Sequence, residues 1–238
     1  MSNKTYLWIE DRIGKASYTF WTTFMHELCP EVIVESKRNN RELVKAVKGL
    51  TDKENKYIIA LDNSFDNVQI YMEQKILKEA ADKRDNVFLL SLICFEYTLL
   101  EFDKLIDWIY AVEDEFRKKR ASAITAREKL LQTLNSGEMN YKVIQEILDY
   151  DSKLDNHNIE QLSAKLLFDL TKNTGFEVSK ADFGECWRQN CCEWTGRQED
   201  DICGLDQTRL TLNDKMRSIC LGTSLYRKFK DIGLEVQA

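Results

Sequence analysis

Four short apolar runs, separated by segments of helical periodicity, constrain the fold of this chain more than any other feature. The runs cover Thr5 to Ile9, Glu31 to Glu35, Tyr57 to Leu61 and Val87 to Ile93. The intervening segments place apolar side chains at helical spacing, and they cover Lys15 to Cys29, Asn40 to Leu50 and Val68 to Ala81. Strands that alternate with helices favour right-handed crossovers and therefore a parallel sheet with helices on its faces. We expect an α/β fold whose Rossmann-like parallel sheet has about four strands.

The chain after residue 110 is predicted to be helical. Amphipathic segments run over Ala111 to Leu134, Tyr141 to Tyr150, Ile159 to Leu170 and Leu210 to Leu221. A single proline and 9 glycines in 238 residues also favour long regular elements. We therefore predict two domains, an α/β domain over residues 1–110 and an all-helical domain over residues 111–238.

Composition limits the partners and the compartment. A net charge of -6 disfavours broad, charge-driven binding of nucleic acid, although it leaves room for a local basic track. The acidic and basic residues Glu10, Asp11 and Arg12 precede any long apolar region, so no signal peptide is expected. The apolar stretch around Val87 to Phe95 is too short to span a bilayer. Seven cysteines, an odd number, fit a reducing compartment, and we expect a cytoplasmic protein without a membrane partner.

Acidic residues follow three of the four predicted strands. Glu10 follows the first strand, Asp62 and Asp66 follow the third, and Glu96 follows the fourth. Because the carboxyl ends of parallel strands meet at one edge of a sheet, these side chains are expected to lie together. Clustered carboxylates are costly unless a hard cation such as Mg²⁺ or Mn²⁺ compensates them. The sequence predicts a metal site there; the alternative is that these acids lie in solvated loops or cap helices, Asp66 at the third helix.

The residues around these acids resemble the Toprim family, the catalytic fold of topoisomerases, primases and OLD-type nucleases. The matching segments are WIEDRIGKASYTFW around Glu10, ALDNSFD around Asp62 and FEYTLLE around Glu96. The resemblance covers about the first 110 residues, and the small Toprim-like nucleases of bacterial anti-phage systems are the most similar group. It implies a metal-dependent nuclease that cleaves phosphodiester bonds in DNA or RNA, with Glu10 and Asp62 as catalytic residues.

Two departures from the Toprim pattern keep a second interpretation open. Asn63 and Ser64 follow Asp62 where the family has Asp-x-Asp, and Asp11 stands where the family has glycine. A degenerate Toprim module that acts as a regulatory subunit, with a protein partner on the helical half, is therefore the alternative. A receiver-like module would also use Glu10, Asp11 and Asp62, but the chain lacks the fifth strand ending in lysine that such a module needs.

Local basic residues and cysteines complete the candidate sites. Nucleic-acid contacts are predicted at Lys15 and at the basic quartet Arg117, Lys118, Lys119 and Arg120, for which a solvated helix face is the alternative. Cys186, Cys191, Cys192, Cys203 and Cys220 raise a zinc alternative, but no Cys-x-x-Cys pair occurs. Ser179 with Asp182 resembles a capping box, and Phe183, Trp187, Cys191 and Trp194 follow at helical spacing. We expect these aromatic residues to form a core stripe and the cysteines to be core residues.

Overall fold

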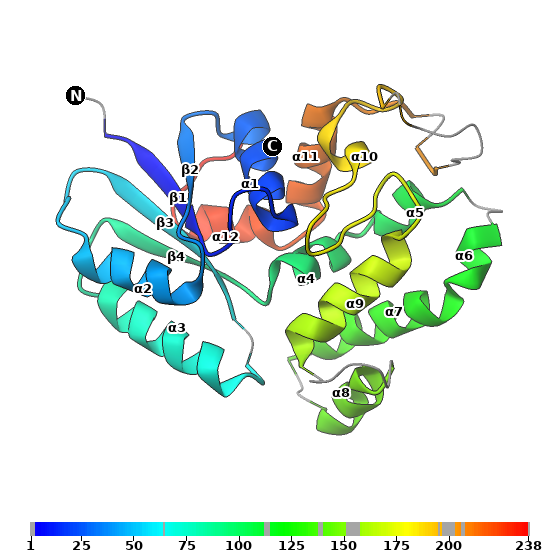
Figure 1. Ribbon diagram of the computed structural model, residues 1–238, viewed down its shortest axis with the longest axis horizontal. Helices are drawn as coiled ribbons and strands as arrows, with labels where there is room; N and C mark the ends of the chain where they lie inside the picture. The colour runs from blue at the N-terminus through cyan, green and yellow to red at the C-terminus, as the bar shows by residue number, and fades with distance from the viewer. Residues whose placement is uncertain are drawn as a thin grey trace.

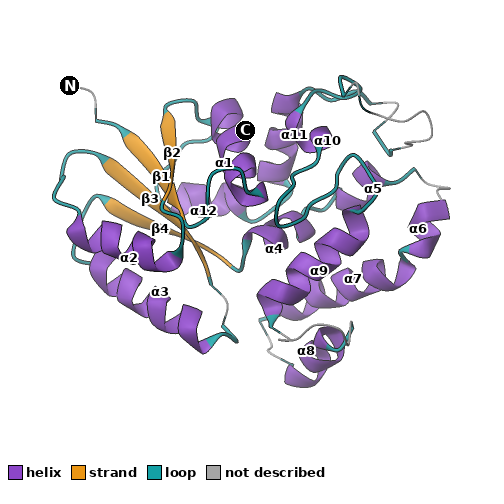
Figure 2. Ribbon diagram, viewed as in Figure 1, coloured by secondary structure: helices purple, strands orange, loops and turns teal. Residues whose placement is uncertain are grey.

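A computed structural model describes residues 3–63, 65–111, 115–137, 140–150, 158–194, 196, 203–205 and 208–237. Its centre is a four-stranded, all-parallel sheet with the strand order β2-β1-β3-β4 (Figures 1 and 2). The strands are β1 (Thr5–Ile9), β2 (Val32–Ser36), β3 (Lys56–Asp62) and β4 (Val87–Leu92). All four lie where the apolar runs predicted them, so the general α/β class and the parallel sheet are confirmed.

Strand β3 lies inside the sheet and sets the register of the carboxyl edge. It pairs with β1 from Thr5 opposite Lys56, and with β4 up to Asp62 opposite Leu92. Its residues 57–61 are all buried. Because β1, β3 and β4 run parallel, the chain leaves each of them at the same edge, and the acidic residues that follow β1 and β3 come close together.

Helices cover both faces of the sheet (Figure 1). Helices α2 (Asn40–Gly49) and α3 (Val68–Ala81) cover one face, where Leu43, Val47 and Leu77 pack against Tyr57 and Ile59. Helices α1 (Ala16–Leu28), α11 (Leu212–Leu221) and α12 (Leu225–Asp231) belong to the larger core on the other face. Alternate residues of each strand point to opposite faces, which explains why the central strands are apolar throughout.

Six of the seven remaining helices contribute buried side chains to the same large core, and the short helix over Glu115–Lys119 contributes none. The seven are α4 (Phe95–Leu100), α5 (Leu105–Ile109), α6 (Glu115–Lys119), α7 (Ala121–Asn135), α8 (Tyr141–Leu148), α9 (Ile159–Thr171) and α10 (Glu185–Arg188). The helical character of the second half is therefore confirmed. The C-terminal helix α12 nevertheless reaches back to the α/β part, since the rings of Phe229 and Phe24 lie 5.7 Å apart. The boundary at residue 110 stays a prediction, and the two parts share one hydrophobic core.

The segment from Ser179 to Trp194 differs from its prediction. Phe183 and Trp187 are buried, as expected, whereas Cys191 and Trp194 are only partly buried, and within residues 179–194 only Glu185–Arg188 is helical. Val178 forms an antiparallel bridge with Phe183 instead. Gly184 lies so close to the backbone of Gly175 that a Cβ atom at Gly184 would stand 2.4 Å from the carbonyl oxygen of Gly175. Tertiary packing therefore replaces the helix that the spacing of the apolar residues suggested.

None of the helices that the structure describes is both long enough and apolar enough to cross a membrane.

Candidate metal centre

Five acidic side chains from four places in the chain line one pocket of about 560 Å³ at the carboxyl edge of the sheet. Glu10 and Asp11 follow β1, Asp62 is the last residue of β3, and Glu96 lies in the first turn of α4, just after β4. Glu160 comes from the first turn of α9 in the helical half. The structure thus brings together Glu10, Asp62 and Glu96, three of the four residues predicted as metal ligands. We refer to this cavity as the carboxylate pocket.

Glu160 was missed by the sequence analysis because it follows no strand. Its helix begins at the N-cap residue Asn158, whose side chain accepts a hydrogen bond of 2.9 Å from the backbone NH of Gln161. Helix α9 then packs against α4, the helix that carries Glu96. The available signal was an acidic residue two positions after an asparagine cap, in the first turn of a helix with an apolar stripe. Such a residue is common at helix starts and does not indicate a site by itself.

Glu10 and Asp62 form the most strongly perturbed pair of the pocket. Burial raises the pKa of Glu10, while its hydrogen bond with Asp62 opposes the rise and the negative charge of Asp11 adds to it. Burial also raises the pKa of Asp62 well above its ordinary range, and the charge of Glu10 and the hydrogen bond between the two groups raise it further. Two carboxyl groups that share a hydrogen bond hold a proton between them, as like charges in close contact require.

Glu96 and Glu160 extend the same electrostatic pattern. Burial raises the pKa of Glu96 to about 7, and the charges of Glu160 and Asp11 contribute. Burial and the charge of Asp11 raise the pKa of Glu160, whereas the nearby Lys180 lowers it. Lys180 and Lys15 also line the pocket, and these two lysines are its cationic side chains. Acids with raised pKa values that converge in one pocket are typical of a functional site.

The donor set fits a hard divalent cation. Carboxylate oxygens are the ligands that Mg²⁺ and Mn²⁺ prefer, and a bound cation would offset the repulsion that raises these pKa values. Within the described ranges, no three His, Cys, Asp or Glu side chains already stand in a metal-binding arrangement. The hydrogen bond between Glu10 and Asp62 engages oxygens that would face a cation, so binding must displace the shared proton.

Asp66 lies apart from the carboxylate pocket and has a structural partner. Its Oδ2 atom accepts a hydrogen bond of 2.8 Å from the backbone NH of Ile159, the first residue of α9. The cap of α3 is Asn67, not Asp66, because the Asn67 side chain accepts from Gln69 and Ile70. Asp66 therefore ties the strand end to the start of the helix that carries Glu160. Ser64, where the family has its second aspartate, lies outside the described residues.

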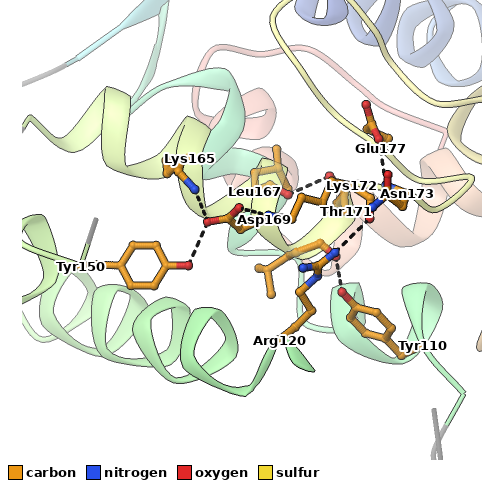
Figure 3. Close-up of polar contacts among 11 residues, drawn as sticks. Tyr110, Arg120, Tyr150, Lys165, Leu167, Asp169, Thr171, Lys172, Asn173 and Glu177 are labelled. Atoms are coloured by element: carbon orange, nitrogen blue, oxygen red, sulfur yellow. Dashed lines mark hydrogen bonds and ion pairs between the residues drawn. The ribbon is translucent and has the colours of Figure 1, made fainter. Parts of the chain in front are cut away.

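The opposite end of α9 is held by a polar network (Figure 3). The Asp169 carboxylate accepts hydrogen bonds from Lys165, from Lys172 and, at 3.0 Å, from the hydroxyl of Tyr150. Burial raises the pKa of Asp169, but these hydrogen bonds outweigh it and the net pKa is lowered. Tyr110 donates its hydroxyl proton to the carbonyl oxygen of Leu170. Both ends of α9 are thus anchored, which fixes the position of Glu160 over the sheet edge.

The predicted basic residues divide into two places. Lys15 lines the carboxylate pocket, but the quartet on and after α6 does not, and α6 lies at the far side of the helical half (Figure 1). The Nη1 atom of Arg117 lies 3.6 Å from Oδ1 of Asp107, and the Nζ atom of Lys118 lies 2.6 Å from Oε1 of Glu115. Arg120 donates to the carbonyl oxygen of Lys172, as Figure 3 shows. Lys118 and Lys119 are exposed, and both contact side chains of their own helix, since the ammonium group of Lys119 lies 5.3 Å from the ring centre of Phe116. This exposure favours the solvated-face interpretation.

Of the cysteines expected in the core, Cys220 is buried in the large core, whereas Cys192 is exposed. Cys186, Cys191, Cys192 and Cys203 line a narrow cavity beside Lys215. The buried Lys215 donates to the backbone carbonyl oxygens of Cys186 and Gln189, at 2.7 and 2.8 Å. The absence of zinc stays a prediction.

The fold and the site together define an α/β protein with a carboxylate-lined pocket at the carboxyl edge of a parallel sheet. Comparisons with protein-family models, with curated proteins and with solved structures return no match for this chain.

Proposed function

We propose that this protein is a metal-dependent nuclease that cleaves phosphodiester bonds at the carboxylate pocket. The observation that carries the proposal is the convergence of Glu10, Asp62, Glu96 and Glu160 from four elements in one pocket with two lysines. Resemblance to the Toprim family at Glu10 and Asp62 supports the same chemistry. That resemblance extends to anti-phage nucleases, so DNA or RNA of an infecting phage is the substrate class that we propose.

The side chains of the pocket have distinct roles in this proposal. Glu10, Asp62, Glu96 and Glu160 would hold Mg²⁺ or Mn²⁺, which when bound polarises a phosphoryl group and offsets its developing charge. In the alternative role in which Glu10 does not coordinate the cation, its carboxylate, whose pKa burial raises to about 7, would accept a proton from an attacking water. Lys15 and Lys180 supply positive charge for the phosphate oxygens. Phe95 and Phe168 contribute apolar surface that limits access of water.

Cleavage assays with two isosteric variants test the function. Glu10→Gln and Asp62→Asn keep the size of each side chain but remove a charge that binds the cation, so each is expected to lower cleavage of single-stranded DNA and RNA by at least about 100-fold. Both variants should keep their fold, as measured by circular dichroism, since the substitutions relieve repulsion. The matched control is Glu146→Gln, an exposed residue of α8 outside the pocket. Cleavage by both variants at the rate of the wild-type protein would end the proposal.

One observation favours a second candidate, a regulatory module that binds a protein partner. Helix α3 exposes an apolar stripe formed by Val68, Tyr71, Met72 and Ile76. Exposed apolar patches of this kind often mark interaction surfaces. A wild-type protein that binds no divalent cation and cleaves no nucleic acid would leave this candidate in place of the nuclease. A receiver-like module is disfavoured, because the described residues form a sheet of only four strands.

A further inference from the structure

Helices α2 and α3 carry an excess of basic residues on a chain that is acidic overall. Residues 38–50 and 68–84, which contain the two helices and their flanking turns, include eight Lys and Arg residues against four Asp and Glu residues. The eight are Arg38, Arg41, Lys45, Lys48, Lys75, Lys78, Lys83 and Arg84. Because the whole chain has a net charge of -6, positive charge is concentrated on this face of the sheet.

Most of these basic side chains have no ionic partner. Among the described residues, only Lys45 of the eight forms an ion pair, in which its Nζ atom lies 2.6 Å from Oε1 of Glu42. The basic quartet on and after α6 differs, because Arg117 and Lys118 each pair with an acid. Paired charges of both signs are typical of a solvated helix face. Unpaired positive charge on two neighbouring helices indicates a surface for an anionic partner.

Helices α2 and α3 pack side by side, and both begin at the carboxyl edge of the sheet (Figure 1). A cavity of about 600 Å³ lies at their N-terminal ends, next to the carboxylate pocket, and another of about 490 Å³ lies at their C-terminal ends. We refer to the surface along the two helices, from one cavity to the other, as the α2/α3 seam. The cavity at the C-terminal ends is the basic groove, and it is lined by Lys48, Ile76, Glu79, Ala80, Lys83 and Arg84.

The two ends of the α2/α3 seam differ in charge. The charged residues that line the cavity at the carboxyl edge are three glutamates and one arginine, namely Glu10, Glu73, Glu160 and Arg41. That end suits a cation. The charged residues that line the basic groove are three cations and one glutamate, namely Lys48, Lys83, Arg84 and Glu79. Phosphate groups are therefore expected to bind at the far end of the seam.

The basic groove holds one of its cations in a fixed position. The Nη2 atom of Arg84 donates a hydrogen bond of 3.1 Å to the carbonyl oxygen of Lys48, which ties the end of α3 to the end of α2. The side chains of Lys48 and Lys83 are exposed and make no hydrogen bond within the described part of the chain. A positioned guanidinium beside two unpaired ammonium groups suits phosphate oxygens.

An aromatic side chain lies along the same helix. Tyr71 of α3 is 56% exposed, and Lys75 follows it after one helical turn, so the two side chains share one face. Bases of a single strand stack on exposed aromatic rings, and the neighbouring ammonium group contacts the backbone. A ring interleaved with lysines thus favours nucleic acid among the polyanions that a basic surface could bind.

We propose that the α2/α3 seam is the docking surface for the nucleic-acid substrate, with phosphates in the basic groove and the bound strand leading along α3 to the carboxylate pocket. This inference rests on the proposed function and adds the surface that holds the substrate. Helix α3 has 14 residues and is about 20 Å long, which about six nucleotides span at 3.4 Å each. A shorter strand cannot reach both ends of the seam.

Binding of a fluorescein-labelled single-stranded oligonucleotide longer than the seam, measured by fluorescence anisotropy with Ca²⁺ in place of Mg²⁺, tests this inference. The double variant Lys48→Gln/Lys83→Gln removes two phosphate contacts and should weaken binding by at least about tenfold in dilute salt. The slope of log affinity against log salt should fall by about 1.4, since each contact on a single strand contributes about 0.7. Its melting temperature should stay unchanged, because both side chains are exposed.

The matched control is Lys129→Gln/Lys142→Gln, which removes two charges from exposed residues of α7 and α8 that line neither cavity of the seam. It should bind the oligonucleotide as the wild-type protein does. Wild-type affinity and salt slope in Lys48→Gln/Lys83→Gln, or an equal loss in the control, would overturn the inference. A wild-type protein that binds vesicles of phosphatidylglycerol but no oligonucleotide would also overturn it, in favour of a membrane surface.

Hydrolysis of the small diester bis(p-nitrophenyl) phosphate with Mn²⁺ separates this inference from the proposed function. The small diester needs the carboxylate pocket alone, so Lys48→Gln/Lys83→Gln should hydrolyse it at the wild-type rate. A wild-type protein that hydrolyses neither this diester nor nucleic acid would contradict the proposed function. Normal hydrolysis together with unchanged oligonucleotide binding in the double variant would contradict the docking surface and leave the proposed function intact.

Discussion

At the scale of single residues, the carboxylate pocket is distinguished by acids whose pKa values are raised. Glu10, Asp62, Glu96 and Glu160 all have raised pKa values, and burial is the largest cause for each. Such groups reduce the stability of the fold once they ionise, and a protein keeps them at this cost where they serve a site. Cation affinity should accordingly rise with pH, because protons and the cation compete for the same oxygens.

Glu96→Gln tests the electrostatic cost. The pKa of Glu96 is raised from 4.5 to about 7 in the folded protein, so between these values the folded state binds more protons than the unfolded state. The free energy of unfolding therefore falls as pH rises through this window, and the penalty is fully present above about pH 7. Glu96→Gln should melt higher than the wild-type protein at about pH 8, by about 2–4 °C for each kcal/mol relieved.

The same comparison near pH 4.5 provides the internal control, because the wild-type carboxyl group is then protonated and resembles the amide. Thermal unfolding of both proteins across this pH range, with Glu146→Gln as the surface control, measures the difference. A constant difference at every pH, or a variant less stable than the wild-type protein at about pH 8, would contradict the pKa assignment.

Three of these four acids were predictable from the sequence, because each lies close in the chain to a predicted strand. Glu10, Asp62 and Glu96 each follow an apolar run closely, and a parallel sheet brings such positions to one edge. Glu160 follows β4 by more than sixty residues along the chain and reaches the pocket only because α9 packs on α4. That contact depends on tertiary packing, for which the sequence offers no short-range signal.

At the scale of elements, the predicted bounds are correct where one hydrophobic periodicity extends through the whole segment. They are incomplete where tertiary contacts determine the local structure. β1 and α3 have the predicted bounds because their apolar pattern and flanking caps agree. The chain around Gly184 and Trp187 forms a loop with one short helix, because Gly184 packs against backbone and the Trp187 indole donates to the carbonyl oxygen of Phe176. Neither contact is encoded in the spacing that suggested a longer helix.

Asp66 provides a test of the link between β3 and α9. Asp66→Ala removes the acceptor of the Ile159 backbone NH and is expected to destabilise the protein by about 0.5–2 kcal/mol, as loss of a helix cap does. Asp66→Asn retains an acceptor oxygen and should stay close to wild-type in both melting temperature and cation affinity. Thermal unfolding and Mn²⁺ titration of the two variants separate the roles. If Asp66→Asn abolished Mn²⁺ binding as completely as Asp62→Asn, Asp66 would be a metal ligand, as its position after the third strand predicted.

At the scale of the whole molecule, the pocket depends on both parts of the chain. The sheet edge supplies Glu10, Asp62 and Glu96, the helical part supplies Glu160 and Lys180, and one core joins the two parts from Leu7 to Leu234. The helical part therefore contributes side chains to the pocket directly. Removing a carboxylate from either part should weaken the same cation site.

Calorimetric titration with Mn²⁺ at about pH 8 tests this claim most directly. The proteins compared are the wild type, Asp62→Asn from the sheet edge, Glu160→Gln from α9 and the control Glu146→Gln. We predict that the wild type and the control bind Mn²⁺ with equal affinity, and that Asp62→Asn and Glu160→Gln each bind at least about tenfold more weakly. A wild-type protein that binds no Mn²⁺, or Asp62→Asn and Glu160→Gln variants that bind it as tightly as the wild type, would contradict the account.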